Sequence, residues 1–277
     1  MPSENTVLQY QARIKTLSLA KIDAIADPDS LFAWFAKNQL GTSSQKSYLS
    51  AIKYASKDSI FPEVLQEKLT SNYKKQNDTD KQQKLTKAQA LHYLDWNDIL
   101  AVQKKLADML NKTESQQKHL LVVSLYTLTP PVRADYGDVE IFKNKAPKLR
   151  PRTGNELIWT KNPVFIFREY KTAKTYGEVV LPIPKSLVTV IENYFTFLGK
   201  VPQFLLGEKT SANTLSTYIQ SIFKQYTGKE TGVSLLRHSF ITFIFPTLTT
   251  ILKKESLARQ MLHSRQLQET YVSAAHI

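Results

Sequence analysis

The change from helix to strand lies within residues 115–142, SQQKHLLVVSLYTLTPPVRADYGDVEIF. Apolar residues at helical spacing run from about Ser115 to Thr127, and Pro130-Pro131 stops the pattern because proline cannot continue a helix. Short runs of β-branched and aromatic residues follow at Val139–Phe142, Val164–Tyr170 and Val179–Ile183. These runs predict a small antiparallel sheet.

Most of the remaining chain has helical periodicity. Apolar residues recur at helical spacing on both sides of the predicted sheet, as in Leu31–Leu40, Ile99–Leu110 and Asn213–Tyr226. Residues 74–87, KKQNDTDKQQKLTK, contain one apolar residue and predict an exposed linker. We therefore expect a mixed, mainly α fold, with a helical domain at 1–80, a linker at 81–90 and an α+β domain at 91–277.

Charge and composition limit the classes of function. The 277 residues carry 37 Lys and Arg against 24 acidic residues, a formal net charge of +13, and 42% of them are hydrophobic. A folded chain with this excess predicts a polyanionic partner. The absence of cysteine excludes disulfide frameworks, cysteine-ligated metal centres and thiol nucleophiles. We expect an intracellular protein with no membrane role, because no apolar run reaches the roughly 20 residues of a membrane span.

The positive charge is concentrated between Ile141 and Thr175. This stretch has nine basic and two acidic residues, so that 9 − 2 gives +7. It is either a solvated surface or a sheet that contacts phosphates. The basic residues are Lys143, Lys145, Lys148, Arg150, Arg152, Lys161, Arg168, Lys171 and Lys174.

Four separated stretches carry the candidate chemistry. They are TPPVRADY (129–136) with Arg133, EYKTAKTYGEVVLPIP (169–184) with Lys171, SLLRHSF (234–240) with Arg237, and MLHSRQLQETY (261–271) with His263 and Tyr271. In this order they resemble the tyrosine recombinases, the phage integrase family. That family has an Arg after a helix, a Lys on a β-turn, the motifs H-x-x-R and L-G-H-S, and a later Tyr. The resemblance covers about residues 90–271, and the helical front part is similar to the family's core-binding domain.

The resemblance implies cleavage and rejoining of duplex DNA, without cofactor or metal, by a homo-tetramer on synapsed sites. Arg133 and Arg237 would hold the scissile phosphate, since a guanidinium donates two parallel hydrogen bonds and keeps its charge. Tyr271 would be the nucleophile that forms a 3′-phosphotyrosyl intermediate, and His263 its hydrogen-bonding neighbour. Lys171 would be the general acid, with Lys174 as the alternative because the turn aligns either way. DNA integration by a mobile element or a large DNA virus is the implied setting.

The sequence departs from the family pattern in several places. Ser234 occupies the position of the H-x-x-R histidine, and serine cannot act as a base near neutral pH. Met-Leu-His-Ser replaces Leu-Gly-His-Ser around His263. His238 is expected to be a buried helix residue. These departures keep alternatives open: a type IB topoisomerase, a DNA-binding protein of the same fold that has lost catalysis, or a basic structural protein of a virion or chromatin.

Overall fold

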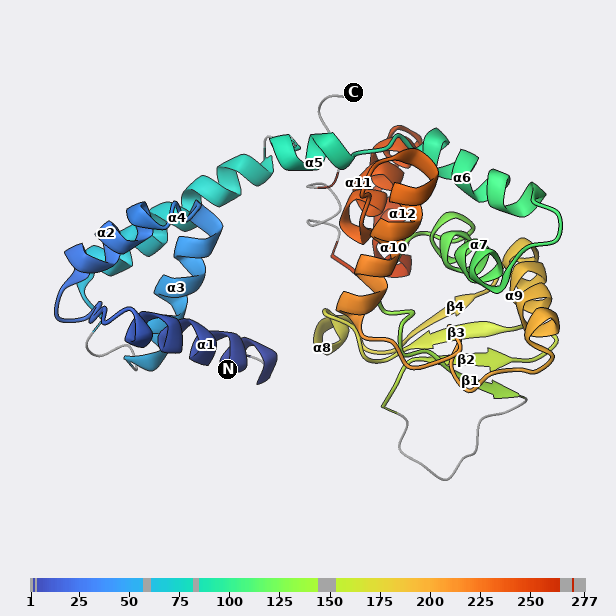
Figure 1. The fold of residues 1–277 in the computed structure, drawn as a ribbon, viewed down its shortest axis with the longest axis horizontal. Helices are drawn as coiled ribbons and strands as arrows, with labels where there is room; N and C mark the ends of the chain where they lie inside the picture. Colours follow the sequence, from blue (N-terminus) through green and yellow to red (C-terminus); the bar gives the residue numbers. More distant parts are fainter. Residues whose placement is uncertain are drawn as a thin grey trace. The chain divides into compact units, whose positions relative to one another are not determined.

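The computed structural model describes Pro2, 4–56, 61–81, 85–143, 153–264 and Tyr271. The chain divides into two compact units, Met1–Gln82 and Gln83–Ile277, and each has its own hydrophobic core (Figure 1). Within the described ranges, no helix is long and apolar enough to cross a membrane. The expected mixed, mainly α fold class is confirmed.

The first unit consists of helices packed around a small apolar core. Its elements are α1 (Glu4–Leu19), α2 (Pro28–Lys37), α3 (Thr42–Ala55) and α4 (Glu63–Lys81). Helix α3 packs against both α1 and α4. The start of α2 is fixed by Asp27, whose side chain accepts a hydrogen bond from the Ser30 amide at 3.2 Å. Leu31, Leu49 and Leu65 are fully buried in the core of this unit.

Helix α4 extends further than the predicted linker allows. It ends at Lys81, so the first part of the stretch 74–87 is helical, and α5 (Lys87–His92) begins inside the expected linker at 81–90. The helical part contains neither Gly nor Pro, and Lys and Gln are good helix formers that remain solvated on an exposed helix. Low apolar content therefore marked exposure here, and did not mark loss of helix.

The second unit alternates helices with a four-stranded sheet. After α5 come α6 (Trp96–Asp108), α7 (Glu114–Thr127), β1 (Glu140–Lys143), β2 (Glu156–Trp159), β3 (Val164–Phe167), α8 (Ala173–Tyr176) and β4 (Val179–Pro182). The chain continues with α9 (Lys185–Leu198), α10 (Ala212–Thr227), α11 (Val233–Ile244), the 3₁₀ turn η1 (Phe245–Thr247) and α12 (Ile251–Gln260). Helix α7 is capped by a reciprocal pair of hydrogen bonds between Thr113 and Gln116.

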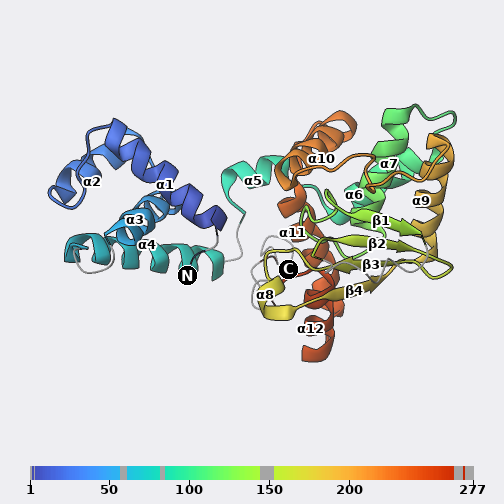
Figure 2. The same ribbon diagram turned by 90° about the horizontal axis from the view of Figure 1, so that it is seen from below.

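The sheet is mixed, and the prediction of an antiparallel sheet is wrong in this respect. Its order is β1-β2-β3-β4; β1 and β2 run parallel, and the other two pairs are antiparallel (Figure 2). The sequence runs predicted β1, β3 and β4 but not β2, whose four residues are too short to show a pattern. Across the sheet, Ile141, Leu157 and Phe165 lie in register and are buried in the core.

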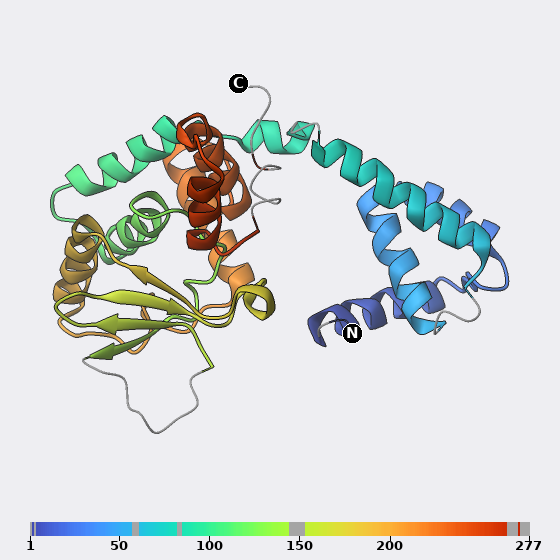
Figure 3. The same ribbon diagram turned by 180° about the vertical axis from the view of Figure 1, so that it is seen from behind.

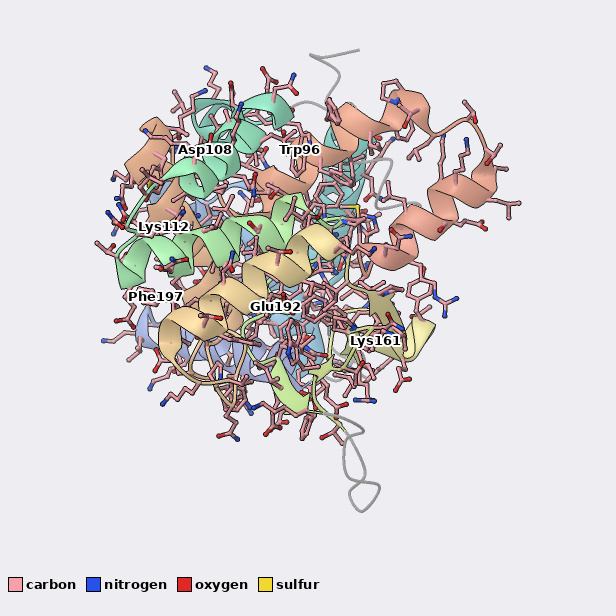
Figure 4. All side chains as sticks on the ribbon, turned by 90° about the vertical axis from the view of Figure 1, so that its right-hand side faces the viewer. Trp96, Asp108, Lys112, Lys161, Glu192 and Phe197 are labelled. Atoms are coloured by element: carbon pink, nitrogen blue, oxygen red, sulfur yellow. The ribbon has the colours of Figure 1, made fainter. Side chains whose placement is uncertain are left out.

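Helices cover the buried face of this sheet. Helix α7 packs against α6 and α9, and all but its first turn is buried (Figure 1). Figure 4 looks onto these three helices, with Trp96 at the start of α6 and Glu192 on the exposed side of α9. Trp96 is buried because its ring meets the Phe240 ring of α11 edge-on, with centroids 4.9 Å apart. This contact joins the α6–α7 layer to the helix that carries Arg237.

Candidate active site

Arg133 lies on the segment that leaves α7, and the core holds its backbone. The Tyr126 hydroxyl donates a hydrogen bond to the Arg133 carbonyl at 2.9 Å. Three residues further along, the fully buried Tyr136 ring meets the rings of Tyr126 and Phe165 edge-on, with centroids 5.5 and 5.2 Å away. The segment is therefore fixed to both α7 and the sheet. The Arg133 Nη1 donates to the carbonyl of Leu262 at 3.4 Å.

Arg237 is buried in α11 with only 1% of its surface exposed. Its Nη1 donates to the carbonyls of Pro131 at 2.7 Å and Met261 at 3.0 Å, which ties α11 to the Arg133 segment and to the end of α12. Burial lowers the pKa of Arg237, yet a guanidinium stays charged at neutral pH. Its Nε is buried and has no hydrogen-bond partner among the described residues. A buried cation with a free donor is suited to an anionic ligand.

His263 is placed by the turn that ends α12. The amide of Leu262 donates to the Arg259 carbonyl at 3.1 Å, and the amide of His263 donates to the Ala258 carbonyl at 3.0 Å. This is the Schellman arrangement, which requires a left-handed residue after the cap, and Leu262 accordingly has φ +54°. Glycine usually fills this position, which gives a physical reason for the Leu-Gly-His-Ser pattern and shows that Leu262 adopts the same backbone conformation.

The tautomer of His263 follows from its contact with Arg237. The Arg237 Nη2 lies 2.7 Å from the His263 Nδ1, and because a guanidinium only donates, Nδ1 must be the acceptor. Burial, together with the charges of Arg237 and Arg133, lowers the pKa of His263 to about 3. The imidazole is therefore neutral at physiological pH and carries its proton on Nε2. That Nε2 is buried and has no partner in the described part of the chain, so it is a second donor available to an anion.

Tyr271 lies over these two residues. Its ring stacks on the His263 ring at 25° with centroids 5.8 Å apart, and the Arg237 Cζ is 5.3 Å from the tyrosine ring centroid. The His238 ring meets it edge-on at 4.4 Å. The tyrosine side chain is thus held between an imidazole and a guanidinium, and the structure brings Arg133, Arg237, His263 and Tyr271 into one cluster.

His238 contacts Tyr271, a role that the sequence did not reveal. It is half-buried, where a buried helix residue was expected, and its Nδ1 lies 2.9 Å from the Tyr271 carbonyl. A carbonyl only accepts, so Nδ1 carries the proton; burial also lowers the pKa of His238 and favours its neutral form. The Thr242 hydroxyl reaches the same carbonyl at 3.5 Å. One turn of α11 therefore fixes the tyrosine backbone next to the buried arginine.

Lys171 lies in the turn between β3 and α8, and its side chain is exposed. Its neighbour Thr172 donates a hydrogen bond to the Leu262 carbonyl at 3.0 Å, so this turn touches the cluster. Lys174 lies within α8 and is also exposed. Ser234, at the start of α11 and one turn before Arg237, is exposed as well. Figure 3 shows the α8 turn and β4 beside the layer formed by α11 and α12.

Asn155, just before β2, joins the arginine segment to the lysine turn. Its side chain is 1% exposed; its Nδ2 donates to the carbonyls of Asp135 and Glu169 and to a carboxylate oxygen of Asp138, at 3.0 to 3.3 Å. Its Oδ1 accepts from the amides of Arg168 and Glu169, both at 3.0 Å. Nothing in a lone Asn between Gly and Glu distinguishes this role in the sequence.

The basic stretch 141–175 is only partly described. Lys145, Lys148, Arg150 and Arg152 lie outside the described residues. Arg168 is paired with Glu156 at 3.1 Å and with Glu178 at 2.6 Å, so it serves the structure of the sheet. The remaining lysines of the stretch that the structure describes are exposed. In the described ranges, no three His, Asp or Glu side chains gather in the manner of metal ligands.

The arrangement is suited to binding a phosphate diester beside a phenol. Two guanidinium groups and one neutral imidazole supply donors, and the tyrosine ring lies in contact with them. Asp135 is also close enough to feel both arginines; burial raises its pKa to about 6, and the charges of Arg133 and Arg237 oppose that rise. The positive charge of the cluster is therefore largely uncompensated near neutral pH.

Comparisons with known proteins find similarity at the level of structure. No family model matches the chain, and no curated protein matches its sequence. Among solved structures, the chain is similar to one described as a crystal structure of XerA recombinase, with a TM-score of 0.46 and 15% sequence identity. The similarity covers 98% of this chain and 88% of that one.

Proposed function

We propose that the chain is a DNA strand transferase of the tyrosine type, a recombinase or integrase that cleaves and rejoins duplex DNA. One observation carries the proposal: Arg237 is buried with an unpartnered Nε and donates to His263, while the ring of Tyr271 lies over both. A buried cation with free donors beside a phenol is costly to retain unless an anion binds there. The net charge of +13 supports a nucleic acid as that anion.

In the proposed reaction, the Tyr271 oxygen attacks a backbone phosphorus. The bond between the phenolic oxygen and phosphorus forms, the bond from phosphorus to the 5′ oxygen breaks, and a 3′-phosphotyrosyl link results. Arg133, Arg237 and the Nε2–H of His263 would donate hydrogen bonds to the non-bridging oxygens as charge develops on them. His263 is neutral, so it acts here as a donor and takes no proton from the phenol.

Lys171 is the proposed general acid. Its ammonium would give a proton to the departing 5′ oxygen, and the phenol proton passes to solvent. Thr172 anchors the turn directly next to Lys171, whereas Lys174 lies two residues further into α8, and this contact favours Lys171 over Lys174. Rejoining is the reverse step with a 5′ hydroxyl from another strand. The phosphodiester energy is retained in the phosphotyrosyl bond, so ATP is unnecessary.

The proposed partners are duplex DNA and further copies of the chain. Exchange between two duplexes requires four cleaved strands and therefore four protomers on two synapsed sites. We propose the first unit as the core-binding domain, because its lysines include Lys46 and Lys53, which lie over aromatic rings at a helical surface. Integration of mobile or viral DNA remains the proposed setting.

Covalent capture tests the proposal. The protein is incubated with a pool of duplexes that have a randomised central segment and a 5′-bridging phosphorothiolate, and adducts that survive denaturation are isolated and sequenced. We expect an adduct with wild type, none with Tyr271→Phe, and one with the matched control Tyr176→Phe, since Tyr176 is an exposed residue of α8. An adduct that survives Tyr271→Phe refutes the assignment of the nucleophile.

Two other outcomes lead to the alternatives. Relaxation of any supercoiled plasmid by dilute protein, without site preference, would indicate a type IB topoisomerase. Tight binding to DNA with no adduct on any captured sequence would indicate a DNA-binding protein that has lost catalysis. The exposed Ser234 is the feature that the second alternative depends on, so Ser234→His is included: a gain of adduct only in that variant supports lost catalysis.

A further inference from the structure

The carbonyl of Leu262 is the meeting point of three parts of the cluster. It accepts from the Arg133 Nη1 at 3.4 Å and from the Thr172 hydroxyl at 3.0 Å, and its own residue precedes His263. Leu262 lies beyond the last residue of α12, and its left-handed φ turns the chain at this point. Its carbonyl is therefore outside the hydrogen-bond ladder of the helix and is open to donors from elsewhere.

Thr172 reaches this carbonyl across 90 residues of sequence. Threonine hydroxyls in turns usually bond to nearby backbone, and the turn offers such partners. The backbone carbonyl of Thr172 already accepts from the amides of Thr175 and Tyr176, at 3.0 and 3.1 Å. The side chain instead makes a tertiary bond from the β3–β4 connection to the end of α12.

The turn is also clamped on the other side of Lys171. Tyr170 is buried, its hydroxyl donates to the Gly177 carbonyl at 2.7 Å, and its carbonyl accepts from the Ala173 amide at 3.0 Å. Lys171 thus lies between a residue held within the turn and a residue held to the cluster. Without the Thr172 bond, the turn keeps its own shape but loses its attachment to the Leu262 carbonyl.

We propose that Thr172 is a positioning residue, which fixes Lys171 at the leaving oxygen by binding the same carbonyl that holds Arg133. This inference rests on the proposed function and adds a residue to it. Thr172 touches no substrate and acts through Lys171 alone. The phosphate clamp and the proton donor are then registered to one backbone atom.

Thr172→Val and Thr172→Ser are the matched variants. Valine keeps the branched shape without the hydroxyl, and serine keeps the hydroxyl without the methyl group. Each protein is tested on a captured duplex made in two forms, with an ordinary phosphodiester or with a 5′-bridging phosphorothiolate at the cleaved position. The sulfur leaves as a thiolate and needs no proton, so the second form does not depend on the general acid.

We expect Thr172→Val to form the adduct between about tenfold and a hundredfold more slowly on the ordinary duplex, the loss typical of a misplaced reacting group. On the phosphorothiolate duplex its rate should match wild type, as should that of Lys171→Ala. Thr172→Ser should be close to wild type on both forms. Thr172→Val combined with Lys171→Ala should be no slower than Lys171→Ala alone, because the two residues act in one step.

The outcomes separate the positioning role from the proposed function. If wild type forms no adduct on either duplex, the proposed function fails and the positioning role with it. If wild type reacts but the defect of Thr172→Val persists with the sulfur leaving group, the hydroxyl serves Arg133 or the fold, and the positioning role alone is overturned. A slow Thr172→Ser also overturns it. Because the comparison is made between two substrates within one variant, a loss of folded protein affects both rates equally.

Discussion

Leu262 offers a sharp test of the backbone conformation on which the cluster depends. It is 1% exposed, packs in the core of the second unit and has φ +54°. Leu262→Ala and Leu262→Gly both remove the buried side chain, and each should lower the free energy of unfolding by about 2–5 kcal/mol. The informative quantity is the difference between the two variants, because the cavity is nearly the same.

The left-handed backbone reverses the usual order of alanine and glycine. A Cβ in this region costs about 1–2 kcal/mol, and only glycine avoids the cost. Glycine in turn loses about 0.5–1 kcal/mol through its greater freedom in the unfolded chain. The difference leaves Leu262→Gly more stable than Leu262→Ala by about 0.5–1 kcal/mol. In the interior of a helix the order is opposite by about 1 kcal/mol.

Urea unfolding of the full chain measures this difference. The chain has three tryptophans, and only Trp34 belongs to the first unit, so Trp34→Phe provides a background in which Trp96 and Trp159 report the second unit alone. Leu257 is the matched control, because it is buried within α12, and there alanine should be more stable than glycine. If Leu262→Ala equals or exceeds Leu262→Gly in stability, the left-handed turn at the end of α12 is wrong.

Three further predictions follow from the same contacts. The pKa of His263 is about 3 in the folded chain and about 6.5 when unfolded, so the unfolded state binds more protons below about pH 6.5; His263→Asn should therefore remove about 2 kcal/mol of the stability that wild type loses between about pH 6.5 and 5, measured by urea unfolding, with the raised pKa of Asp135 acting in the opposite direction in both proteins. His238→Phe should slow adduct formation about tenfold, because the Tyr271 carbonyl loses a donor, and His238→Asn should restore the rate; equal rates for the two variants would contradict this. Asn155→Ala should lower the free energy of unfolding by about 3 kcal/mol, since two buried amides lose their acceptor, and a loss below about 1 kcal/mol would be inconsistent with the network.

Prediction from sequence succeeded where local pattern decides the outcome. The helical periods, the stop at Pro130-Pro131 and three of the four strands could be located because each depends on neighbouring residues. The parallel pairing of β1 with β2 could not, since four residues such as Glu156–Trp159 carry no pattern and pairing partners are distant in sequence. The helical extension of α4 was missed because a polar helix and a polar linker have the same composition.

The candidate site divides in the same way. Family-like motifs singled out Arg133, Arg237, His263 and Tyr271, and the structure brings them together, while Lys171 is exposed in its turn and linked through its neighbour. Thr172, His238 and Asn155 carried no signal, because each acts through a hydrogen bond to a distant backbone group. A Thr, a His and an Asn in isolation are ordinary residues of a turn, a helix and a loop.

The amino-acid sequence by itself determined the class of fold, the positive charge and the residue types available for chemistry. These depend on composition and on periods of a few residues, which folding does not alter. Only the tertiary structure decided that His263 is a neutral donor, that Leu262 adopts the conformation usual for glycine, and that one carbonyl binds both Arg133 and Thr172. Such properties arise from burial and from contacts between segments about a hundred residues apart, and neither exists until the chain folds.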